Sequence, residues 1–413
     1  MTLYSRLRDE FSFLRGNVLV MMTSWLVMNF AVAIPMTYYS LFVLALGGSP
    51  FIIGTMEFVS FLALASVQFP GGYLADKHGR KNLVVTLTFA MALANVFCVL
   101  APSWPFVLLG VMLQNVFLGA LVPRLQAIMA DSIPSEKRGL GFSTIMFVNN
   151  AAMIFSPVVA GFLCLRYGLV AGMRIAYSVT VVAYSIAAMI RVRLIETLKV
   201  DSDGFSMSNL FREYPRAVRE GLGVWKKLPR SMLLLFLTNA VSSFFGAMFF
   251  PYQVVYATRV LHVDDLSWAF VMMWFSASMV FLALPSGKLA DRVGRKRPAF
   301  VSWVLFAFFP LLFLAGGLFT LLVAYLFFGA SNALYAAAYQ ALEADYVPQE
   351  LRGKEAGCSF FTIFVLMALG GLVGGFLYQS VSPALPFILT FVVTIPCAAI
   401  TLLFIHEPKQ KEK

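Results

Sequence analysis

Long apolar stretches alternate with short polar or turn-rich segments along this 413-residue chain. An α-helix needs about 20 apolar residues to cross the roughly 30 Å hydrocarbon core of a bilayer. Stretches of about that length lie at 17–46, 50–73, 82–101, 105–129, 139–164, 168–190, 231–258, 266–287, 298–318, 320–343, 355–379 and 384–405. Because backbone polar groups find no other partners in lipid, the pattern predicts an all-α membrane protein with twelve transmembrane helices.

Composition agrees with lipid as the solvent for most of the chain. Apolar residues make up 60% of it and charged residues only 12%, whereas a soluble domain has about 25% charged residues. The first apolar stretch has no small-residue cleavage site and is longer than the core of a signal peptide. We therefore expect it to be retained as the first span.

Lysine and arginine are distributed unevenly between the two sides of this topology. With the N-terminus inside, all but four of the 31 Lys and Arg residues fall on the inner side. The exceptions are Arg124, Arg166, Arg174 and Arg259. Since basic residues accumulate in cytoplasmic loops, the chain is predicted to lie in the plasma (inner) membrane with both termini cytoplasmic. Basic loops facing anionic lipid account for the net charge of +11, so nucleic acid is not an expected partner.

The longest polar stretch, 191–230, falls midway along the chain and is predicted to be a cytoplasmic linker. Apolar residues recur in it at the spacing of an amphipathic surface helix; these are Leu210, Tyr214, Val218, Leu222 and Trp225. The linker would separate an N-terminal six-helix bundle at 1–190 from a C-terminal bundle at 231–413.

Two motifs recur in both halves at nearly the same spacing. Gly-Tyr-Leu-Ala-Asp-Lys-His-Gly-Arg-Lys at 72–81 matches Gly-Lys-Leu-Ala-Asp-Arg-Val-Gly-Arg-Lys at 287–296, an offset of 215 residues. Gln-Ala-Ile-Met-Ala-Asp at 126–131 matches Gln-Ala-Leu-Glu-Ala-Asp at 340–345, an offset of 214. Pro35 in the first span matches Pro251 in the seventh at an offset of 216. Matches at one period indicate an internal duplication.

The first motif resembles the signature that the major facilitator superfamily carries between its second and third helices. The resemblance implies two pseudo-symmetric six-helix bundles around one central cavity, working by alternating access. It also implies a conformational latch that closes the cytoplasmic side in the outward-open state and breaks when that side opens. Its residues here are Gly72, Asp76, Gly79, Arg80, Asp131, Arg138, Gly287, Asp291, Gly294, Arg295, Asp345 and Arg352.

The chemistry of these residue types suits such a latch. Gly72 permits close helix approach, and Gly79 suits a turn with positive φ. Asp76 is a short anion suited to a helix N-terminus, and Arg80 can donate two hydrogen bonds to the carboxylate of Asp131. The equivalent residues of the second half are Gly287, Gly294, Asp291, Arg295 and Asp345. The alternative is that these charges only set the topology.

Ionisable residues within spans are costly and are therefore functional candidates. Glu57 in the second span is interpreted as a proton-carrying carboxylate or a partner of Arg174, with an interfacial acid as the alternative. Arg124 in the fourth span and Glu343 in the tenth each face an uncharged residue in the repeat. We interpret them as parts of an inner gate or an anion site, with pairing to loop charges as the alternative.

Uncharged polar residues on the helices expected around the cavity are further substrate candidates. Amides and phenols among Phe and Met suit a broad amphipathic or an uncharged polar ligand, although each residue alone could equally serve helix packing. The candidates are Asn29, Thr37, Tyr38, Tyr39, Gln114, Asn115, Asn149, Asn150, Asn239, Tyr252, Gln253, Tyr256, Asn332, Tyr335, Tyr339 and Gln340.

The chain departs from the pattern of the proton-driven drug exporters of the superfamily. Val111 stands where their fourth helix carries Arg, and Asn115 stands where a Gly follows Leu-Gln. Their fifth-helix Gly-Pro motif is reduced here to Pro157 and Gly161, and the first helix has no acidic residue. These departures weigh against drug/proton antiport but not against translocation of a substrate.

We expect a secondary transporter of a small organic solute, with proton-coupled efflux of amphipathic compounds as the leading hypothesis. Uniport or symport of a sugar-like or other metabolite is the alternative, and a non-transporting receptor or scaffold is the alternative from another class. The histidines His78, His262 and His406 are scattered. No enzyme activity, metal or cofactor is therefore predicted. The expected partners are a small-molecule substrate, protons and membrane lipid, and the chain is expected to be a monomer.

Overall fold

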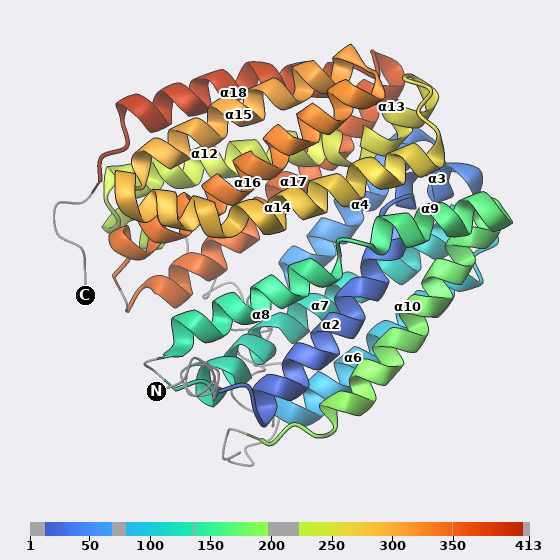
Figure 1. Cartoon of the computed structure of the whole chain (residues 1–413), viewed down its shortest axis with the longest axis horizontal. Helices are drawn as coiled ribbons and strands as arrows, with labels where there is room; N and C mark the ends of the chain where they lie inside the picture. The colour runs from blue at the N-terminus through green and yellow to red at the C-terminus, as the bar shows by residue number, and fades with distance from the viewer. Residues whose placement is uncertain (1–12, 68–79, 135–136, 197–222, 349, 408–413) are drawn as a thin grey trace, which may run out of the picture.

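The computed structural model describes residues 13–67, 80–134, 137–196, 223–348 and 350–407, and every regular element within them is a helix (Figure 1). Eleven helices in this part of the chain are long and apolar enough to span a membrane. The shorter apolar helix α4 (Pro50–Ser66) lies at the second predicted span. Among the predicted latch residues, Gly72, Asp76 and Gly79 lie outside the described residues, as does most of the predicted linker helix.

The first half of the chain forms one bundle. Besides α4, its helices are α2 (Asn17–Met36), α3 (Tyr39–Ala45), α6 (Arg80–Val99), α7 (Trp104–Ser132), α8 (Arg138–Ala152), α9 (Ser156–Tyr167) and α10 (Leu169–Arg191). Helix α10 packs against α2 and α6, and α7 packs against α4 and α6. In Figure 1 this bundle lies below the second one.

The second half forms the other bundle. Its helices are η2 (Trp225–Lys227), α12 (Arg230–Phe249), η3 (Phe250–Tyr252), α13 (Gln253–Arg259), α14 (Asp265–Val293), α15 (Lys296–Ala315), α16 (Leu318–Tyr346), α17 (Arg352–Ser380) and α18 (Leu385–Leu403). Helix α16 packs against α14 and α15, and α12 packs against α17 and α18. Two packed helical bundles confirm the predicted fold class.

Two of the predicted continuous spans are broken near their matched prolines. The stretch 17–46 divides into α2 and α3, with Tyr38 in a non-helical conformation of φ −125° and ψ 17°. The stretch 231–258 divides at the 3₁₀ turn η3, which contains Pro251. Proline lacks the backbone N–H of a helical hydrogen bond and its ring crowds the preceding turn, which explains why α12 ends before Pro251; α2 continues through Pro35 and ends one residue after it.

The halves meet along two seams, α4 against α17 and α9 against α14. At the first seam a Cβ on Gly54 would overlap the carbonyl oxygen of Gly371, and Gly375 lies against the Cα of Gly54. On the other side of α17, a Cβ on Gly370 or Gly374 would overlap the backbone of α12. Glycines at this spacing let α17 lie in backbone contact with both neighbours.

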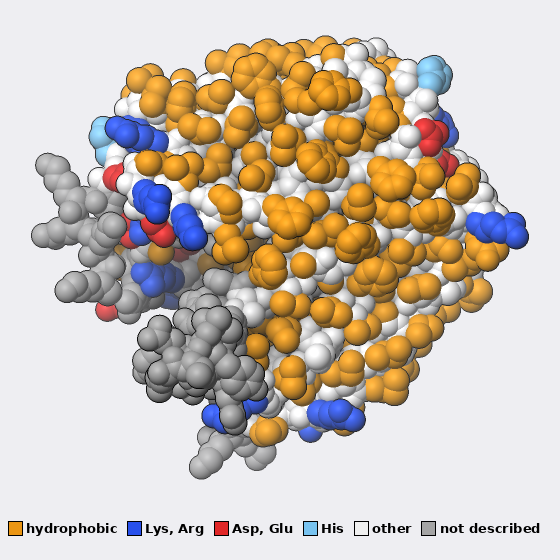
Figure 2. Space-filling view, viewed as in Figure 1, with side chains coloured by type: hydrophobic (Ala, Val, Ile, Leu, Met, Phe, Trp, Pro, Cys, Tyr) orange, Lys and Arg blue, Asp and Glu red, His pale blue; other side chains and the backbone are white. Residues whose placement is uncertain are grey.

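Apolar side chains cover the outside of the two bundles, and charged side chains gather at the two ends of the helices (Figure 2). Exposed residues on this surface include Phe281 at 73% and Leu284 at 66%. A large exposed apolar surface of this kind is typical of an integral membrane protein. We call the side on which α2 begins and α18 ends the terminal side, and the other the opposite side.

Candidate functional site

A cavity of about 900 Å³ lies between the two halves. A volume of this size holds a drug-sized molecule. Helices α2, α3, α4, α6, α7, α9 and α10 line it from the first half, and α12, η3, α13, α14, α15, α16 and α17 line it from the second. The predicted substrate candidates that line it are Asn29, Thr37, Tyr39, Glu57, Gln114, Asn115, Gln253, Asn332 and Tyr335. The structure therefore brings residues from distant parts of the chain to one site.

The other substrate candidates are not among the lining residues. They are Tyr38, Arg124, Asn149, Asn150, Asn239, Tyr252, Tyr256, Tyr339, Gln340 and Glu343. Tyr256 packs against Phe313 and Phe387. Arg124 is buried and donates a hydrogen bond to the carbonyl oxygen of Ala120 in its own helix. Glu343 lies beside the carboxyl group of Glu355.

Glu57 is the only Asp, Glu, Lys or Arg among the described residues that line the cavity. It lies on α4 at the seam between the halves, where a Cβ on Gly371 would come within 2.8 Å of the Glu57 Cβ. The absence of a side chain at Gly371 therefore makes room for the glutamate. Its predicted partner Arg174 instead donates to the carbonyl oxygen of Ala101 at 2.9 Å.

Most of the cavity wall is apolar and aromatic. It includes Tyr39, Phe61, Tyr177, Tyr184, Phe250, Trp268, Phe275, Trp303, Phe306, Phe328 and Tyr335. Many of its hydroxyl and amide groups are already paired within the protein: Ser276 donates to Met272, for example, and Asn332 to Phe328. The wall can therefore bury a large apolar body.

On the opposite side, three hydrogen bonds join the halves. The hydroxyl of Tyr38 donates to the carbonyl oxygen of Asp265, and that of Tyr252 donates to the carbonyl oxygen of Pro50 at 3.0 Å. The backbone N–H of Phe51 donates to Oε1 of Gln379 at 2.9 Å. These contacts hold the halves together there, so the structure is a state closed on the opposite side.

The repeated motifs place one arginine–aspartate pair within each half. Arg80 contacts Asp131 at 2.6 Å, and Arg295 contacts Asp345. Gly294 adopts a φ of 86°, a conformation that favours glycine. Nothing lies within 4 Å of where a Cβ on Gly287 would be, so this glycine makes no close helix contact here. Asp291 is exposed, and the side chain of Arg138 lies outside the described residues.

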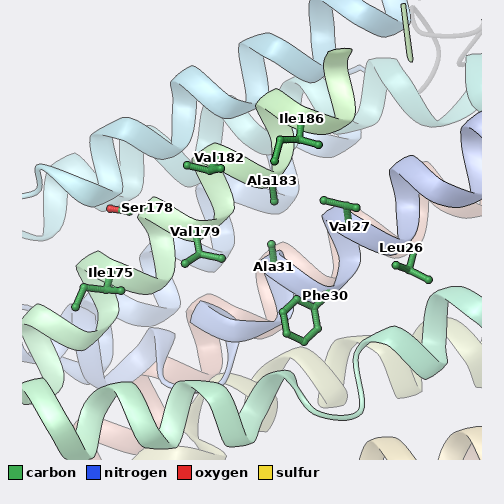
Figure 3. Close-up of a pocket in the computed structure, with 10 residues that line it drawn as sticks. All are labelled: Leu26, Val27, Phe30, Ala31, Ile175, Ser178, Val179, Val182, Ala183 and Ile186. Carbon is green, nitrogen blue, oxygen red and sulfur yellow. The ribbon is translucent and has the colours of Figure 1, made fainter. Parts of the chain in front are cut away.

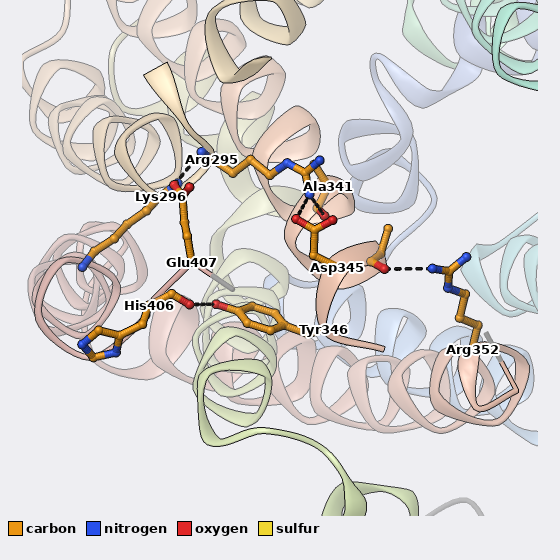
Figure 4. A network of polar contacts seen from close by, with 9 residues as sticks. Arg295, Lys296, Ala341, Asp345, Tyr346, Arg352, His406 and Glu407 are labelled. Atoms are coloured by element: carbon orange, nitrogen blue, oxygen red, sulfur yellow. Dashed lines mark hydrogen bonds and ion pairs between the residues drawn. The ribbon is translucent and has the colours of Figure 1, made fainter. Parts of the chain in front are cut away.

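A network of polar contacts surrounds the second of these pairs (Figure 4). Arg295 also donates to the carbonyl oxygen of Ala341 at 2.5 Å, and Arg352 donates to that of Ala344 at 2.8 Å. Glu407 accepts the backbone N–H groups of Arg295 and Lys296 at 2.7 and 2.6 Å. Because free N–H groups at a helix start attract anions, Glu407 ties the end of the second half to the start of α15.

Comparison with known proteins identifies the fold that carries this cavity. The family model described as Major Facilitator Superfamily matches residues 16–264 and 235–413. The chain belongs to the major facilitator superfamily. It is therefore an integral membrane protein and a secondary transporter of a small-molecule substrate, and not an enzyme.

Individual members of the superfamily are similar over most or part of the chain. Multi-drug resistance efflux pump PmrA of Streptococcus pneumoniae serotype 4 is 26% identical over 361 residues, covering 86% of this chain and 85% of that protein. Multidrug resistance protein MdtG of Citrobacter koseri is 29% identical over 242 residues, covering 57% and 55%.

Solved structures share the fold at low sequence identity. The nucleoside transporter NupG superposes with a TM-score of 0.75 at 13% identity, covering 94% of this chain and 98% of that chain. A D-xylose-proton symporter superposes with a TM-score of 0.72 at 15% identity, covering 96% and 99%. At this level of identity the likeness shows the superfamily fold alone.

Sequence reasoning about this superfamily member missed several residues of the cavity. Ser60 lies one turn after Glu57 on α4, so its place on the same helix face was a usable signal. Asn95 on α6 and Trp268 on α14 gave no such signal, because an isolated Asn or Trp in an apolar span is common. Both are 1% exposed and line the cavity.

Arg191 is another residue that the sequence reasoning missed. Its position next to the polar linker suggested a loop charge, but it ends α10 and is fully buried. Its guanidinium donates to Oγ of Ser24 at 3.1 Å and to Oγ1 of Thr88 at 2.6 Å, which ties together α2, α6 and α10. Through Tyr184, which lies beside it, Arg191 also adjoins the cavity wall.

A second hollow of about 530 Å³ lies between α2 and α10 (Figure 3). Its walls are apolar apart from Ser178, and that hydroxyl donates to the carbonyl oxygen of Arg174 in its own helix. Val182 in this groove is 57% exposed. With no free polar group among its described lining residues to orient a substrate, the groove is not a candidate substrate site.

Proposed function

We propose that this transporter exports small amphipathic compounds, with the lipophilic monocation as its best substrate. The single observation that carries the proposal is the cavity between the halves, which has an apolar and aromatic wall and one carboxylate, Glu57. A desolvated cation needs an anionic partner, and an apolar body needs a wall of this kind. The relatives named as a multi-drug resistance efflux pump and as a multidrug resistance protein support the same interpretation.

Glu57 is also the group that we propose for proton coupling. An ionised carboxylate buried in such a wall is costly unless it is neutralised by a cation or by a proton. Substrate and proton would then compete for one carboxylate, and this competition is sufficient for antiport. This scheme does not need the residues that proton-driven drug exporters carry in their fourth and fifth helices and that this chain lacks.

Purified protein in proteoliposomes tests the function. We expect a pH gradient to drive accumulation of a fluorescent lipophilic monocation, with Glu57→Gln abolishing the dependence on the gradient. Glu350→Gln is the matched control, because Glu350 is an exposed loop residue remote from the cavity. Gradient-driven transport that is unchanged in Glu57→Gln would refute the coupling, and no transport or counterflow of any lipophilic cation would refute the function.

We further propose the predicted orientation, with the termini cytoplasmic. The state closed on the opposite side is then the inward-facing state, which would load a substrate from the cytoplasm or the inner leaflet. Thiol labelling in intact cells tests this: Cys introduced at Glu350 should be protected from an impermeant reagent, whereas Cys introduced at His262 should react. Both positions are exposed. The reverse labelling pattern would show that the termini lie outside the cytoplasm.

The Arg80–Asp131 and Arg295–Asp345 pairs are proposed to belong to the cytoplasmic latch. Each pair lies within one half, so it can hold its own motif in shape while contacts to the other half form and break. A single change at either pair should slow transport, and exchange of the two charges, as in Arg295→Asp with Asp345→Arg, should restore part of the rate. No rescue by exchange would mean that the pair acts through other contacts.

We propose that the apolar outer surface of the two bundles contacts membrane lipid. We propose that residues 1–190 and 231–413 form the two bundles and that a linker at 191–230 joins them. The protein is proposed to function as a monomer. Mass measurement of the purified protein in detergent, corrected for bound lipid and detergent, tests the monomer. A mass of two chains under conditions that retain transport would exclude it.

A further inference from the structure

Five residues that line the cavity each carry a buried polar atom with no hydrogen-bond partner among the described residues. These atoms are Oγ of Ser60, Oδ1 of Asn95, Nε2 of Gln253, Nε1 of Trp268 and the hydroxyl of Tyr335. Buried polar groups are nearly always paired, so a set of unpaired ones in one cavity indicates groups that await a ligand. Their distribution over the two halves is uneven.

The first half presents acceptors. The Asn95 amide donates through Nδ2 to the carbonyl oxygen of Met91 at 2.8 Å, which leaves the acceptor Oδ1 free. Glu57 on α4 adds a carboxylate, which only accepts hydrogen bonds when ionised. Ser60, one turn along α4 and 4% exposed, can accept or donate. This wall suits a cation or another hydrogen-bond donor.

The second half presents two groups that can only donate, besides the Tyr335 hydroxyl, which can donate or accept. The hydroxyl of Tyr325 donates to Oε1 of Gln253 at 2.5 Å, which fixes the amide so that the donor Nε2 is free. The indole of Trp268, which has only a donor, packs edge-on against Tyr325 with ring centroids 5.8 Å apart. Gln253 is 4% exposed and Trp268 is 1% exposed, so both donors are shielded from bulk water.

We propose that the cavity binds its substrate in one orientation. The cationic or hydrogen-bond-donating end lies against Glu57, and a neutral acceptor such as a carbonyl oxygen lies against Gln253 and Trp268. This inference rests on the proposed function and narrows it: the preferred substrate is a lipophilic cation that also carries a hydrogen-bond acceptor at its other end. A ligand without that acceptor leaves two buried donors unpaired, which lowers its affinity.

Two matched ligands test the orientation. Both are aryl-alkyl quaternary ammonium ions of the same length, one with a ketone in the chain and one with a methylene in its place. Binding is measured on the purified protein by calorimetry. We expect the ketone to bind about tenfold more tightly, the difference that one satisfied hydrogen bond of about 1.4 kcal/mol produces.

Variants then locate the contact. Trp268→Phe keeps the ring and removes the N–H, and Gln253→Met removes the amide donor at similar length. Either variant should bring the ratio of the two ligand affinities close to one. Glu57→Gln should instead weaken the binding of both ligands and leave that ratio unchanged. Trp274→Phe is the matched control on α14, because the Trp274 N–H is already paired with the carbonyl oxygen of Leu322 at 3.0 Å. It should leave the ratio unchanged.

The outcomes separate the orientation from the function. If both ligands bind equally and are exported, or if folded Trp268→Phe and Gln253→Met keep the full preference, the orientation is overturned and the export function stands. If neither ligand binds or is exported, the proposed function fails and the orientation fails with it. Thermal unfolding of each variant confirms that a lost preference is measured on folded protein.

Discussion

The hydroxyl of Tyr38 donates a hydrogen bond to the main-chain oxygen of Asp265, the first residue of α14. In the other half, Tyr252 donates to Pro50, the first residue of α4. Each tyrosine lies at the break in the first span of its half and reaches the start of the second span of the other half. The duplication thus provides two equivalent ties across the opposite side, made at helix starts and independent of the motifs on the terminal side.

Removing both ties should favour the state that is open on the opposite side. Each hydrogen bond contributes about 0.5–1.5 kcal/mol, so Tyr38→Phe with Tyr252→Phe should shift the equilibrium between states by roughly fivefold or more. Spin labels at Tyr167 and His262, both exposed, report the distance across this side. Tyr256→Phe is the control, since that ring packs against Phe313 and Phe387. An unchanged distance distribution in the double variant would contradict the role of the ties.

Gly54→Ala should prevent close approach of α4 and α17. The added Cβ would overlap the carbonyl oxygen of Gly371, and a backbone atom cannot move aside as a flexible side chain can. We expect the overpacking to destabilise the state closed on the opposite side by about 1–3 kcal/mol and to slow the transport cycle. Gly353→Ala on α17 is the control, because nothing lies within 4 Å of its Cβ position. Equal transport rates in the two variants would show that the seam tolerates a side chain.

Arg191→Ala should destabilise the first half. The change removes hydrogen bonds to Ser24 and Thr88 and leaves a cavity where a buried side chain joins three helices. A cost of about 2–4 kcal/mol is expected from the lost packing and the two lost hydrogen bonds. Thermal unfolding in detergent measures it, with the exposed Arg193→Ala as control. A melting temperature equal to that of the control would mean that the three-helix tie is not stabilising.

Asp264 should stabilise the start of α14 only when ionised. Hydrogen bonds from Ser267 hold the pKa of the Asp264 carboxyl below its usual value, and the backbone N–H of Ser267 lies 2.9 Å from Oδ1. A depressed folded-state pKa means that this stabilisation is present at neutral pH and is lost as the pH falls through the folded-state pKa. Asp264→Ala should therefore cost about 1 kcal/mol at pH 7, with a smaller difference in acid. Asp264→Asn, which caps a helix without ionising, should not show that pH dependence in unfolding measurements.

The class of protein could be predicted because its signals are local. A run of about 20 apolar residues specifies a spanning helix wherever it packs. The motifs around Asp76 and Asp291 identify the duplication by their spacing alone, and the matched prolines Pro35 and Pro251 lie beside both helix breaks. The pairing of Arg80 with Asp131 followed from the same motifs, because one helix begins at Arg80 and the next ends beside Asp131 on the same side.

The composition of the cavity could not be predicted in this way. Tyr38 and Tyr39 are neighbours in sequence, yet Tyr39 lines the cavity and Tyr38 bonds to the other half. Gln114 and Asn115 face the cavity, whereas Asn149 and Asn150 do not line it. Successive residues of a helix point about 100° apart, and a uniformly apolar span carries no periodicity that shows which face is turned inward.

Amino-acid order by itself thus determined the membrane class, the twofold repeat and the residues that pair within each half, since these depend on run length and on spacing. Tertiary structure decided which polar atoms remain unpaired in the cavity and which tyrosines tie the halves together. These depend on helix rotation and on glycine contacts such as that of Gly54 with Gly371, which bring together atoms from segments more than 300 residues apart in the chain.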